Sequence, residues 1–412
     1  MKFGLIGYPL GHSWSKEIHG HFISHPYEMY EMKEDALDAF LKSKDFDGLN
    51  VTIPYKQAVI PYLDAMDEAC KRIGAVNCIV NENGKLKGYN TDYIGFMEML
   101  VQNHVDVKDK NVAVLGTGGA SKAICEALHQ LHAHITLVSR NQKEGVITYD
   151  TLYENEKQFE VIVNTTPIGM YPNCDATVID IARFTNVNTV VDIIANPLLT
   201  RLQFEAKCMG MKVLGGFEML VRQAFAADEL FLHQKMDASM IQPCMNDLLY
   251  TRRNIILIGM PTAGKTTVCT SLAKATHKKA IEMDDEIVQK LGTSIKECFA
   301  SKGEAYFRRI ETEVAKEHRE ARGEIISCGG GVITQKETMR YLSENGIVIW
   351  IKRDFHNLFP TDSRPLSSSE EAIKKMYDDR YPLYEKYSDI QIENNETIEN
   401  VIHKIITCIR GE

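Results

Sequence analysis

Gly259-Met-Pro-Thr-Ala-Gly264-Lys265-Thr266 is the most informative segment of this 412-residue chain. It matches the phosphate-loop pattern G-x-x-x-x-G-K-[ST] at every fixed position. An apolar run beginning at Asn254 leads into it like a buried strand, and residues 265–276 continue with a helical pattern. In such a loop, backbone N–H groups and the helix N-terminus hold phosphate oxygens, the lysine reaches the outer phosphates, and the threonine hydroxyl can ligate magnesium. We therefore expect an α/β nucleotide-binding domain over residues 254–412, in which the nucleotide contacts Gly259, Ala263, Gly264, Lys265, Thr266 and Thr267.

Length and composition bound the rest of the chain. About 250 residues precede the loop, which is enough to bury a separate hydrophobic core. Hydrophobic residues make up 44% of the chain and charged residues 25%, as is usual for globular proteins. The formal net charge of −9 argues against a general binder of nucleic acid or anionic membranes.

The sequence also excludes several kinds of site and location. No apolar run approaches the roughly 20 residues of a membrane span, and the N-terminal residues lack the pattern of a signal peptide. The ten cysteines show no C-x-x-C spacing, so we expect neither a zinc site nor a redox dithiol. Unpatterned thiols suit a reducing compartment, and we expect a cytoplasmic location without nucleic-acid or membrane partners. Monomer and homodimer both remain open.

The sequence before the phosphate-loop domain predicts two further domains. Residues 3–7 and 48–52 resemble strands and residues 35–42 and 57–73 resemble helices, which predicts a small α/β domain over residues 1–105. From residue 106 to 216, strands alternate with helices, as in a Rossmann-like doubly wound parallel sheet. The strands expected there are residues 111–115, 134–139, 161–164, 190–194 and 212–214. A helix at about residues 217–235 would complete the first domain, and residues 236–253 would form a short linker before the third.

A glycine-rich turn opens the second of these domains. Gly116-Thr-Gly118-Gly119-Ala120 stands between an expected strand and an amphipathic helix, which predicts a dinucleotide site. The following strand ends in Ser139-Arg140-Asn141 and not in the acidic residue that usually binds the ribose hydroxyls of NAD. Arg140 can pair with a 2′-phosphate, so NADP is favoured. The predicted cofactor contacts are Gly116, Gly118, Gly119, Ala120, Ser139, Arg140 and Asn141.

Five short clusters carry a family resemblance over roughly residues 1–235. They are Gly11-His-Ser13-Trp-Ser15, Asn50-Val-Thr52-Ile-Pro-Tyr-Lys56, Gly74-Ala-Val-Asn77, Gly88-Tyr-Asn90-Thr91-Asp92 and Gly216-Phe-Glu-Met-Leu-Val-Arg-Gln223. Together they resemble the shikimate dehydrogenase family. The resemblance implies that Lys56 and Asp92 form the catalytic pair and that Gly216 adjoins the cofactor. It implies that the substrate, 3-dehydroshikimate or shikimate, is bound by Ser13, Ser15, Thr52, Asn77 and Gln223.

These residue types suit the reduction of a ring ketone. The reaction needs a hydride on carbon, which NADPH supplies, and a proton on oxygen from a positioned acid. Lys56 can supply or relay that proton if it is held close to the oxygen, and Asp92 can orient Lys56 and bind a ring hydroxyl.

Two departures from the family pattern leave alternatives open in the first half. Ala195 stands where a tyrosine often touches the substrate. Residues 141–159 are too short for the helix usually found near the cofactor phosphate. A preference for quinate as substrate, or for NAD as cofactor, therefore remains an alternative.

The motifs after the phosphate loop resemble shikimate kinase over roughly residues 252–412. In order they are Glu282-Met-Asp284-Asp285, Gly303-Glu-Ala-Tyr-Phe-Arg308, Gly329-Gly330-Gly331, Ser363-Arg364-Pro365-Leu366 and Arg380-Tyr-Pro-Leu-Tyr384. The resemblance implies that Asp284 orients or deprotonates the attacking hydroxyl and that Arg308 and Arg380 grip the shikimate carboxylate. Gly330 and Gly331 would offer backbone contacts to the substrate, and Arg364 would reach the transferring phosphoryl group from a lid.

Phosphoryl transfer requires neutralised charge, excluded water and an aligned nucleophile. Lys265, Arg364 and a magnesium ion near Thr266 and Glu282 would meet the first need. Glu282 replaces a common aspartate, and residues 355–369 lack the arginine that often stacks on adenine. A dehydrogenase fused to an inactive, nucleotide-sensing module is therefore the alternative. The two resemblances support each other, because shikimate dehydrogenase makes the substrate of shikimate kinase. We therefore expect a bifunctional enzyme that uses NADP(H), ATP and Mg²⁺.

Overall fold

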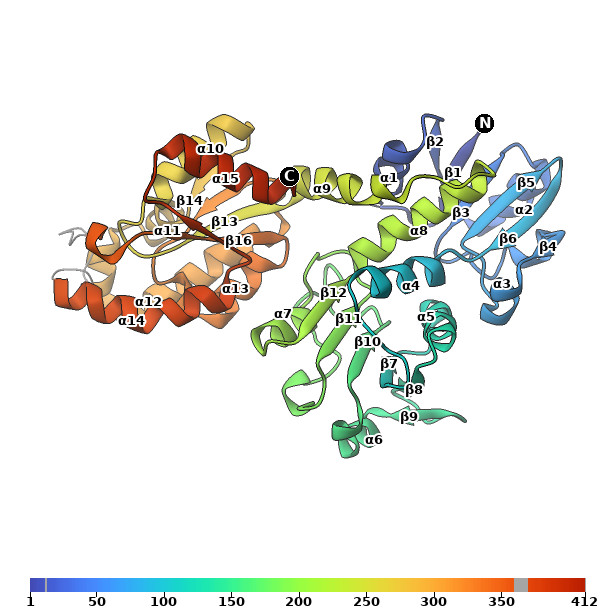
Figure 1. The fold of residues 1–412 in the computed structure, drawn as a ribbon, viewed down its shortest axis with the longest axis horizontal. Coiled ribbons are helices and arrows are strands. Elements are labelled where there is room, and N and C mark those ends of the chain that lie inside the picture. Colours follow the sequence, from blue (N-terminus) through green and yellow to red (C-terminus); the bar gives the residue numbers. More distant parts are fainter. Residues whose placement is uncertain (12, 359–369, 412) are drawn as a thin grey trace. The chain divides into compact units, whose positions relative to one another are not determined.

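The computed structural model describes residues 1–11, 13–358 and 370–411. The chain divides into two compact units, Met1–Leu248 and Leu249–Glu412. Three β-sheets and the helices around them make up these units (Figure 1), so the predicted α/β class is confirmed. No helix among the described residues is both long enough and apolar enough to cross a bilayer.

The first sheet is mixed and has the strand order β2-β1-β3-β5-β6-β4. Strand β1 runs parallel to β2 and β3, whereas β5 runs antiparallel to β3 and β6. Its strands are β1 (Phe3–Gly7), β2 (Tyr27–Glu31), β3 (Gly48–Val51), β4 (Ala65–Met66), β5 (Cys78–Glu82) and β6 (Lys85–Tyr89). The helices of this part are α1 (Ser15–Phe22), α2 (Glu34–Ser43) and α3 (Glu68–Ile73). Buried aliphatic side chains on the strands, such as Ile6 and Leu49, form its core.

The helix expected at residues 57–73 is wrong over most of its length, because only α3 at its end is α-helical. Pro61 stands inside the expected helix, where proline lacks the N–H donor and clashes with the preceding turn. Residues 60–62 form a short 3-10 turn instead. Asp67 then begins α3 by accepting a hydrogen bond of 2.6 Å from the Cys70 backbone N–H.

The second sheet is parallel throughout, with the order β12-β11-β10-β7-β8-β9. Its strands are β7 (Asn111–Leu115), β8 (His134–Ser139), β9 (Val146–Thr148), β10 (Val161–Asn164), β11 (Thr189–Asp192) and β12 (Lys212–Gly215). Its helices are α5 (Gly119–Gln130), α6 (Tyr149–Glu154) and α7 (Arg201–Cys208). The chain winds from β7 toward both edges, and ligands of such sheets bind where the winding reverses, beyond the carboxyl ends of the strands. Strand β9 and α6 occupy the stretch that is too short for the usual helix, and the sequence did not predict β9.

Two helices join the first two sheets. Helices α4 (Asp92–Gln102) and α8 (Gly216–Phe231) pack side by side between them (Figure 1). Helix α8 follows β12 directly and also contacts β5 of the first sheet. These helices therefore bring Asp92 and Gln223 to the first sheet. The residues predicted as a linker contain a further helix, α9 (Ile241–Arg252).

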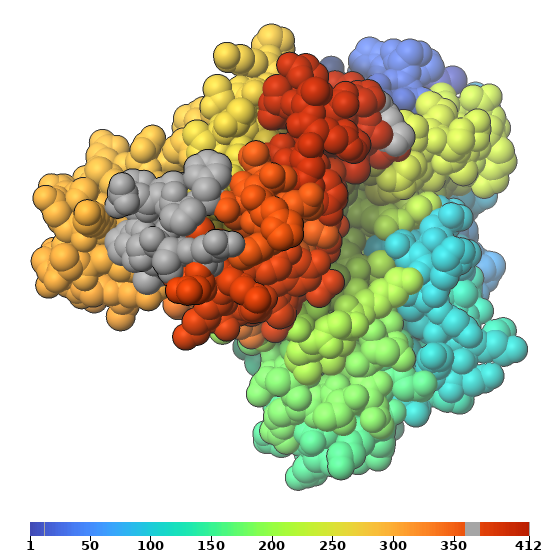
Figure 2. Space-filling model, turned by 60° about the vertical axis from the view of Figure 1, so that its left-hand side comes forward, coloured from blue at the N-terminus to red at the C-terminus, as the bar shows by residue number. Residues whose placement is uncertain are grey.

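The second unit is built on a parallel sheet of order β14-β15-β13-β16-β17. Its strands are β13 (Asn254–Ile258), β14 (Ala280–Glu282), β15 (Ile325–Ser327), β16 (Gly346–Lys352) and β17 (Ile390–Glu393). Its helices are α10 (Lys265–Thr276), α11 (Met283–Leu291), α12 (Ile295–Glu317), α13 (Lys336–Ser343), α14 (Glu370–Tyr387) and α15 (Ile398–Arg410). Helices α10 and α15 lie side by side at the surface of this unit (Figure 2). The central strand β13 is fully buried and leads into the phosphate loop, as its apolar sequence predicts.

Candidate active sites

A cavity of about 240 Å³ in the first unit gathers all the predicted substrate and catalytic residues of that unit. They come from the segment before α1 and its first residue, the loop after β3, the residue before β5, the start of α4 and the middle of α8. In chain order they are Ser13, Ser15, Thr52, Lys56, Asn77, Asp92 and Gln223. Ser13 and Ser15 are joined by a hydrogen bond of 3.0 Å between their hydroxyls. The fold thus assembles side chains that are more than 200 positions apart in the sequence.

Lys56 and Asp92 form the centre of a hydrogen-bonded network in this cavity. Lys56 Nζ lies 2.6 Å from Asp92 Oδ2, and both side chains keep partial contact with solvent. Asn77 Nδ2 donates to Asp92 Oδ1 at 2.9 Å, so each carboxylate oxygen has its own donor. Buried Thr91 donates to Gln223 Oε1 at 3.1 Å. These bonds hold Asp92 and Gln223 in place before any ligand arrives.

Asn50 is a cavity residue that sequence reasoning did not single out, although it opens the quoted Asn50–Lys56 cluster. It is buried, it lines the cavity, and its Nδ2 has no hydrogen-bond partner among the described residues. Its Oδ1 accepts a hydrogen bond of 2.8 Å from the Tyr27 hydroxyl. A buried donor without a partner is unfavourable by about 1–3 kcal/mol. A substrate oxygen in the cavity would satisfy it.

A buried ion-pair candidate lies behind Tyr27. His19 Nδ1 lies 2.7 Å from Asp228 Oδ1, and both side chains are inaccessible to solvent. The His19 ring stacks on the Tyr27 ring with centroids 4.1 Å apart. Burial raises the pKa of Asp228, opposed by the charge and hydrogen bond of His19. Burial, with a smaller effect of Asp228, also holds the pKa of Tyr27 well above its usual value, so its phenol remains a donor.

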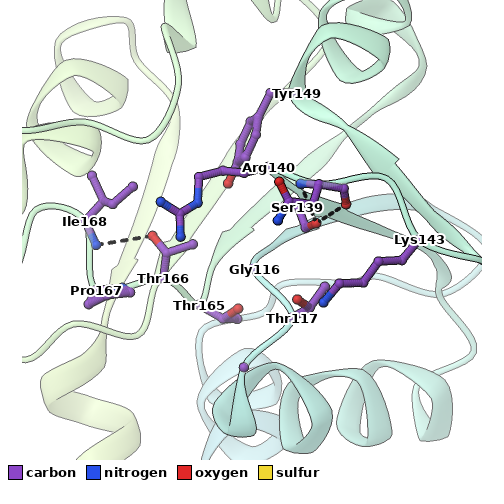
Figure 3. A pocket seen from close by; sticks show the side chains of 12 residues that line it. Gly116, Thr117, Ser139, Arg140, Lys143, Tyr149, Thr165, Thr166, Pro167 and Ile168 are labelled. Atoms are coloured by element: carbon purple, nitrogen blue, oxygen red, sulfur yellow. Dashed lines mark hydrogen bonds between the residues drawn. The ribbon is translucent and has the colours of Figure 1, made fainter.

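A second cavity, of about 390 Å³, lies at the carboxyl ends of β7, β8 and β10. Five predicted cofactor residues line it: Gly116, Gly118, Ser139, Arg140 and Asn141. Figure 3 shows the Arg140 side chain extending toward Thr166, on the segment after β10. Ser139 Oγ donates to the Asn141 carbonyl at 2.6 Å, which fixes the turn that carries Arg140. The remaining predicted residues, Gly119, Ala120 and Gly216, start α5 and α8 and are not among its lining residues.

Two further side chains of this cavity escaped the sequence analysis. Lys143 extends from the turn after β8 toward Thr117 (Figure 3) and adds a second cation to Arg140. Tyr149, at the start of α6, lies near Arg140 (Figure 3). Burial raises the pKa of the Tyr149 phenol, with the Arg140 charge acting in the opposite direction. The position of both residues depends on β9 and α6, whose presence the sequence pattern did not reveal.

The phosphate loop of the second unit closes around its lysine. Lys265 is buried, and its Nζ donates to the carbonyls of Gly259 and Met260 at 2.9 Å each. Gly264 has φ of 89°, in the left-handed region that favours glycine. Asn394, which follows β17, donates from Nδ2 to the Ala263 carbonyl at 2.7 Å. The loop is therefore held in shape by its own lysine and by Asn394 at the end of β17.

Thr266 and Glu282 lie together beside this loop. Thr266 Oγ1 donates to Glu282 Oε2 at 3.3 Å. Glu282 Oε1 is buried without a hydrogen-bond partner among the described residues. Burial raises the pKa of Glu282, opposed by its hydrogen bonds with Ser327 and Thr266. A hydroxyl and a carboxylate with a free oxygen are hard oxygen donors of the kind that Mg²⁺ prefers.

The glycine turn after β15 is enclosed by the predicted shikimate-binding residues. A Cβ atom on Gly331 would lie 2.0 Å from Arg308 Nη2, so the guanidinium packs directly against the backbone of this turn. A Cβ atom on Gly329 would lie 2.8 Å from Asp284 Oδ1, and one on Gly330 would lie 2.8 Å from Pro261 of the phosphate loop. The turn therefore brings Asp284, Arg308 and the phosphate loop to one place.

Glu311 is a buried carboxylate that the prediction did not include. Arg308 Nη1 donates to Glu311 Oε2 at 2.7 Å, whereas Glu311 Oε1 is buried without a partner among the described residues. Burial raises the pKa of Glu311 to about 7, opposed by the nearby charges of Arg308 and Arg380. Buried Arg380 on α14 therefore lies in the same charged cluster. The predicted lid residue Arg364 lies outside the described residues.

Parts of both units match known protein families. Residues 5–79 match the shikimate dehydrogenase substrate binding domain, and residues 261–410 match shikimate kinase. Over 257 residues the chain is 40% identical to shikimate dehydrogenase (NADP(+)) of Clostridium beijerinckii, which covers 58% of this chain and 95% of that protein.

Solved structures agree with this assignment of the first unit. The chorismate mutase/shikimate 5-dehydrogenase fusion protein from Clostridium acetobutylicum is 36% identical, with a TM-score of 0.57 over 60% of this chain and 96% of that chain. Shikimate 5-dehydrogenase from Thermus thermophilus, in complex with NADP(H) and shikimate, is 29% identical, with a TM-score of 0.55 over 60% and 99%. The chain belongs to the shikimate dehydrogenase family and carries a shikimate kinase domain at residues 261–410.

Proposed function

We propose that this bifunctional enzyme reduces 3-dehydroshikimate to shikimate with NADPH and then phosphorylates shikimate at its 3-hydroxyl with MgATP. The observation that carries the first activity is the Lys56–Asp92 pair, 2.6 Å apart inside a cavity lined by hydroxyls and amides. The second activity rests on the phosphate loop lying next to Asp284 and Arg308 at the glycine turn.

In the dehydrogenase, Lys56 would deliver a proton to the ketone oxygen, or remove one in the reverse reaction. Asp92 fixes the lysine and would accept a hydrogen bond from a ring hydroxyl. The hydroxyls of Ser13 and Ser15 would hold the substrate carboxylate, and Thr52, Asn77 and Gln223 would fix the ring. Because the Asn77 amide already orients Asp92, little reorganisation is needed when the substrate binds.

The cavity beyond β7, β8 and β10 fits NADP(H). Its glycine turn brings the backbone close to where a pyrophosphate would lie at the start of α5. Arg140 and Lys143 provide two cations for a 2′-phosphate, and no acidic residue is among the lining residues. When bound, the cofactor supplies the hydride. The remaining predicted contacts, Gly119, Ala120 and Gly216, would lie at its edge.

In the kinase, Asp284 would hold the attacking hydroxyl and accept its proton. Arg308 and Arg380 would bind the carboxylate of shikimate, and the N–H groups of Gly330 and Gly331 would add backbone contacts. Lys265 would exchange its two loop carbonyls for phosphate oxygens of ATP. Thr266 and Glu282 would hold magnesium, directly or through water, and the metal neutralises phosphate charge when bound.

Several further properties are part of the proposal. We place the substrate-binding domain at residues 1–105 and 217–235, the NADP domain at residues 106–216, the linker at 236–253 and the kinase domain at 254–412. We also propose a cytoplasmic enzyme that acts as a monomer or homodimer.

Initial-rate measurements test the substrate and cofactor assignments. The dehydrogenase is assayed with shikimate and quinate, each with NADP and NAD. We expect the largest kcat/KM for shikimate with NADP, and a preference for quinate or NAD would overturn this part. For the kinase, Lys265→Met should abolish ATP-dependent phosphorylation while the dehydrogenase rate stays unchanged. Unchanged phosphorylation in that variant would contradict the assignment of the second unit as a kinase.

A further inference from the structure

Arg353 follows β16 directly, at the carboxyl edge of the sheet in the second unit. The neighbouring strand β17 is in register with it, because Lys352 pairs with Glu393 and the Asn394 N–H donates to the Lys352 carbonyl at 2.7 Å. Arg353 and Asn394 are therefore the first residues beyond two adjacent parallel strands. Ligands of open α/β sheets bind beyond this edge.

Both residues contact the phosphate loop region. Asn394 holds the loop through its bond to the Ala263 carbonyl, and a Cβ atom on Gly264 would lie 2.5 Å from Asn394 Nδ2. The same position is 3.7 Å from Arg353 Nη1. The guanidinium therefore lies beside the loop glycine that precedes Lys265.

Arg353 lies on the side of the phosphate loop opposite to the residues predicted to bind shikimate. In the sheet, β13 is flanked by β15 on one side and by β16 on the other. Asp284, Arg308 and the glycine turn belong to the β14–β15 side, where the phosphoryl acceptor would bind. Arg353 belongs to the opposite side, from which the rest of the nucleotide must approach the loop.

The Arg353 guanidinium keeps hydrogen-bond donors available for a ligand. Its Nε is buried and makes no hydrogen bond in the described part of the chain, nor does its guanidinium pair with a described carboxylate. Its neighbour Lys352 differs, because Lys352 Nζ pairs with Glu393 at 3.1 Å. Arg353 as a whole is half-buried, and leaving its buried Nε without an acceptor costs about 1–3 kcal/mol, which suits a group whose acceptor arrives with the ligand.

We propose that Arg353 is a nucleotide-binding residue of the kinase, donating charge-assisted hydrogen bonds to the phosphate chain of ATP from the β16–β17 side. The proposal rests on the kinase function above and adds a residue to it. Arginine suits this role because its planar guanidinium can bind two phosphate oxygens at once.

Three variants of the whole chain test the proposal. Arg353→Met keeps an unbranched side chain but removes the donors, and Lys352→Met is the matched control one position earlier. Losing one or two charge-assisted bonds predicts roughly tenfold to hundredfold weaker binding of MgADP by calorimetry and a similar rise in KM for ATP in Arg353→Met. Lys352→Met should change either value less than about threefold. Arg353→Lys, which keeps the charge, should recover part of the affinity.

The KM for shikimate in the kinase reaction reports whether the second unit remains folded, and it should stay unchanged in all three variants. Unchanged MgADP affinity in Arg353→Met would overturn the proposal. Equal weakening of adenosine and MgADP would also overturn it, because that result would place Arg353 on the base and not on the phosphates. Calorimetry with MgADP needs no phosphoryl transfer, so a wild-type enzyme that binds MgADP but phosphorylates nothing would refute the kinase function while leaving this test valid.

Discussion

Lys56 Nζ lies 2.6 Å from Asp92 Oδ2, although the two residues are 36 positions apart in the chain. Lys56 comes from the turn after β3 and Asp92 from the first turn of α4. The second oxygen of Asp92 accepts from Asn77 Nδ2. The lysine is therefore aimed by a carboxylate that is itself fixed, which is the arrangement that general acid catalysis requires.

Lys56→Met should lower kcat of the dehydrogenase by roughly a hundredfold to ten-thousandfold, since it removes the proton donor but no cofactor contact. Steady-state kinetics with NADPH measures this effect, and the KM for NADPH should stay unchanged. Exposed Lys108 gives the matched control, and Lys108→Met should leave kcat as it is. A fall of less than tenfold in Lys56→Met would assign the proton transfer to another group.

Tyr27→Phe should raise the KM for 3-dehydroshikimate roughly threefold to tenfold with little change in kcat. The variant removes the donor that holds Asn50 Oδ1, so the buried Asn50 amide is free to turn away from the substrate. Tyr62→Phe is the control, because the Tyr62 hydroxyl bonds Asp38 at the exposed surface. Equal KM values in the two variants would show that Tyr27 does not position Asn50.

Arg140→Ala should weaken NADPH roughly tenfold to a hundredfold and leave NADH nearly unaffected, because only NADPH carries the 2′-phosphate. The ratio of kcat/KM for the two cofactors measures the change. Exposed Lys157 serves as the control, and Lys157→Ala should keep the wild-type ratio. An equal loss for both cofactors in Arg140→Ala would argue that the arginine binds a part that they share.

Glu311 makes the stability of the second unit depend on pH. Burial raises its pKa from 4.5 to about 7, so the folded state keeps the proton to a higher pH than the unfolded state. Glu311 therefore adds about 3 kcal/mol to the free energy of unfolding below about pH 4.5. This stabilisation is lost as the pH rises to about 7. Glu311→Gln should lack this loss.

Trp350 gives a local signal for that comparison. The chain has two tryptophans, and Trp14→Phe leaves buried Trp350 of β16 as the reporter of the second unit. Urea unfolding of this background, with and without Glu311→Gln, is followed by fluorescence at about pH 5.5 and about pH 8. The same pH dependence in both proteins would contradict the shifted pKa of Glu311.

The sequence predicted those parts of the fold whose local pattern agrees with their final structure. Strand β13 and helix α10 were placed correctly because an apolar run and a phosphate loop stand next to each other. The helix expected at residues 57–73 failed because Pro61 outweighed the apolar spacing. Strand β9 escaped because three residues are too few to show a period.

Some site residues were likewise predictable from the sequence and others were not. The residues named from short clusters, such as Lys56 and Asp92, do meet in one cavity, although their individual roles stay predictions. Asn50 and Glu311 were missed because nothing in the sequence shows that an oxygen or nitrogen is buried without a partner. Such atoms are defined by tertiary packing, which brings Tyr27 to Asn50 and the turn at Gly329 to Glu311.

We infer that one chain carries out two consecutive reactions. The most direct test incubates the purified enzyme with 3-dehydroshikimate, NADPH and magnesium, with and without ATP, and identifies the products by mass. We predict shikimate without ATP and shikimate 3-phosphate with ATP. Accumulation of unphosphorylated shikimate in the presence of ATP would contradict the second activity and reduce the second unit to a nucleotide-sensing module.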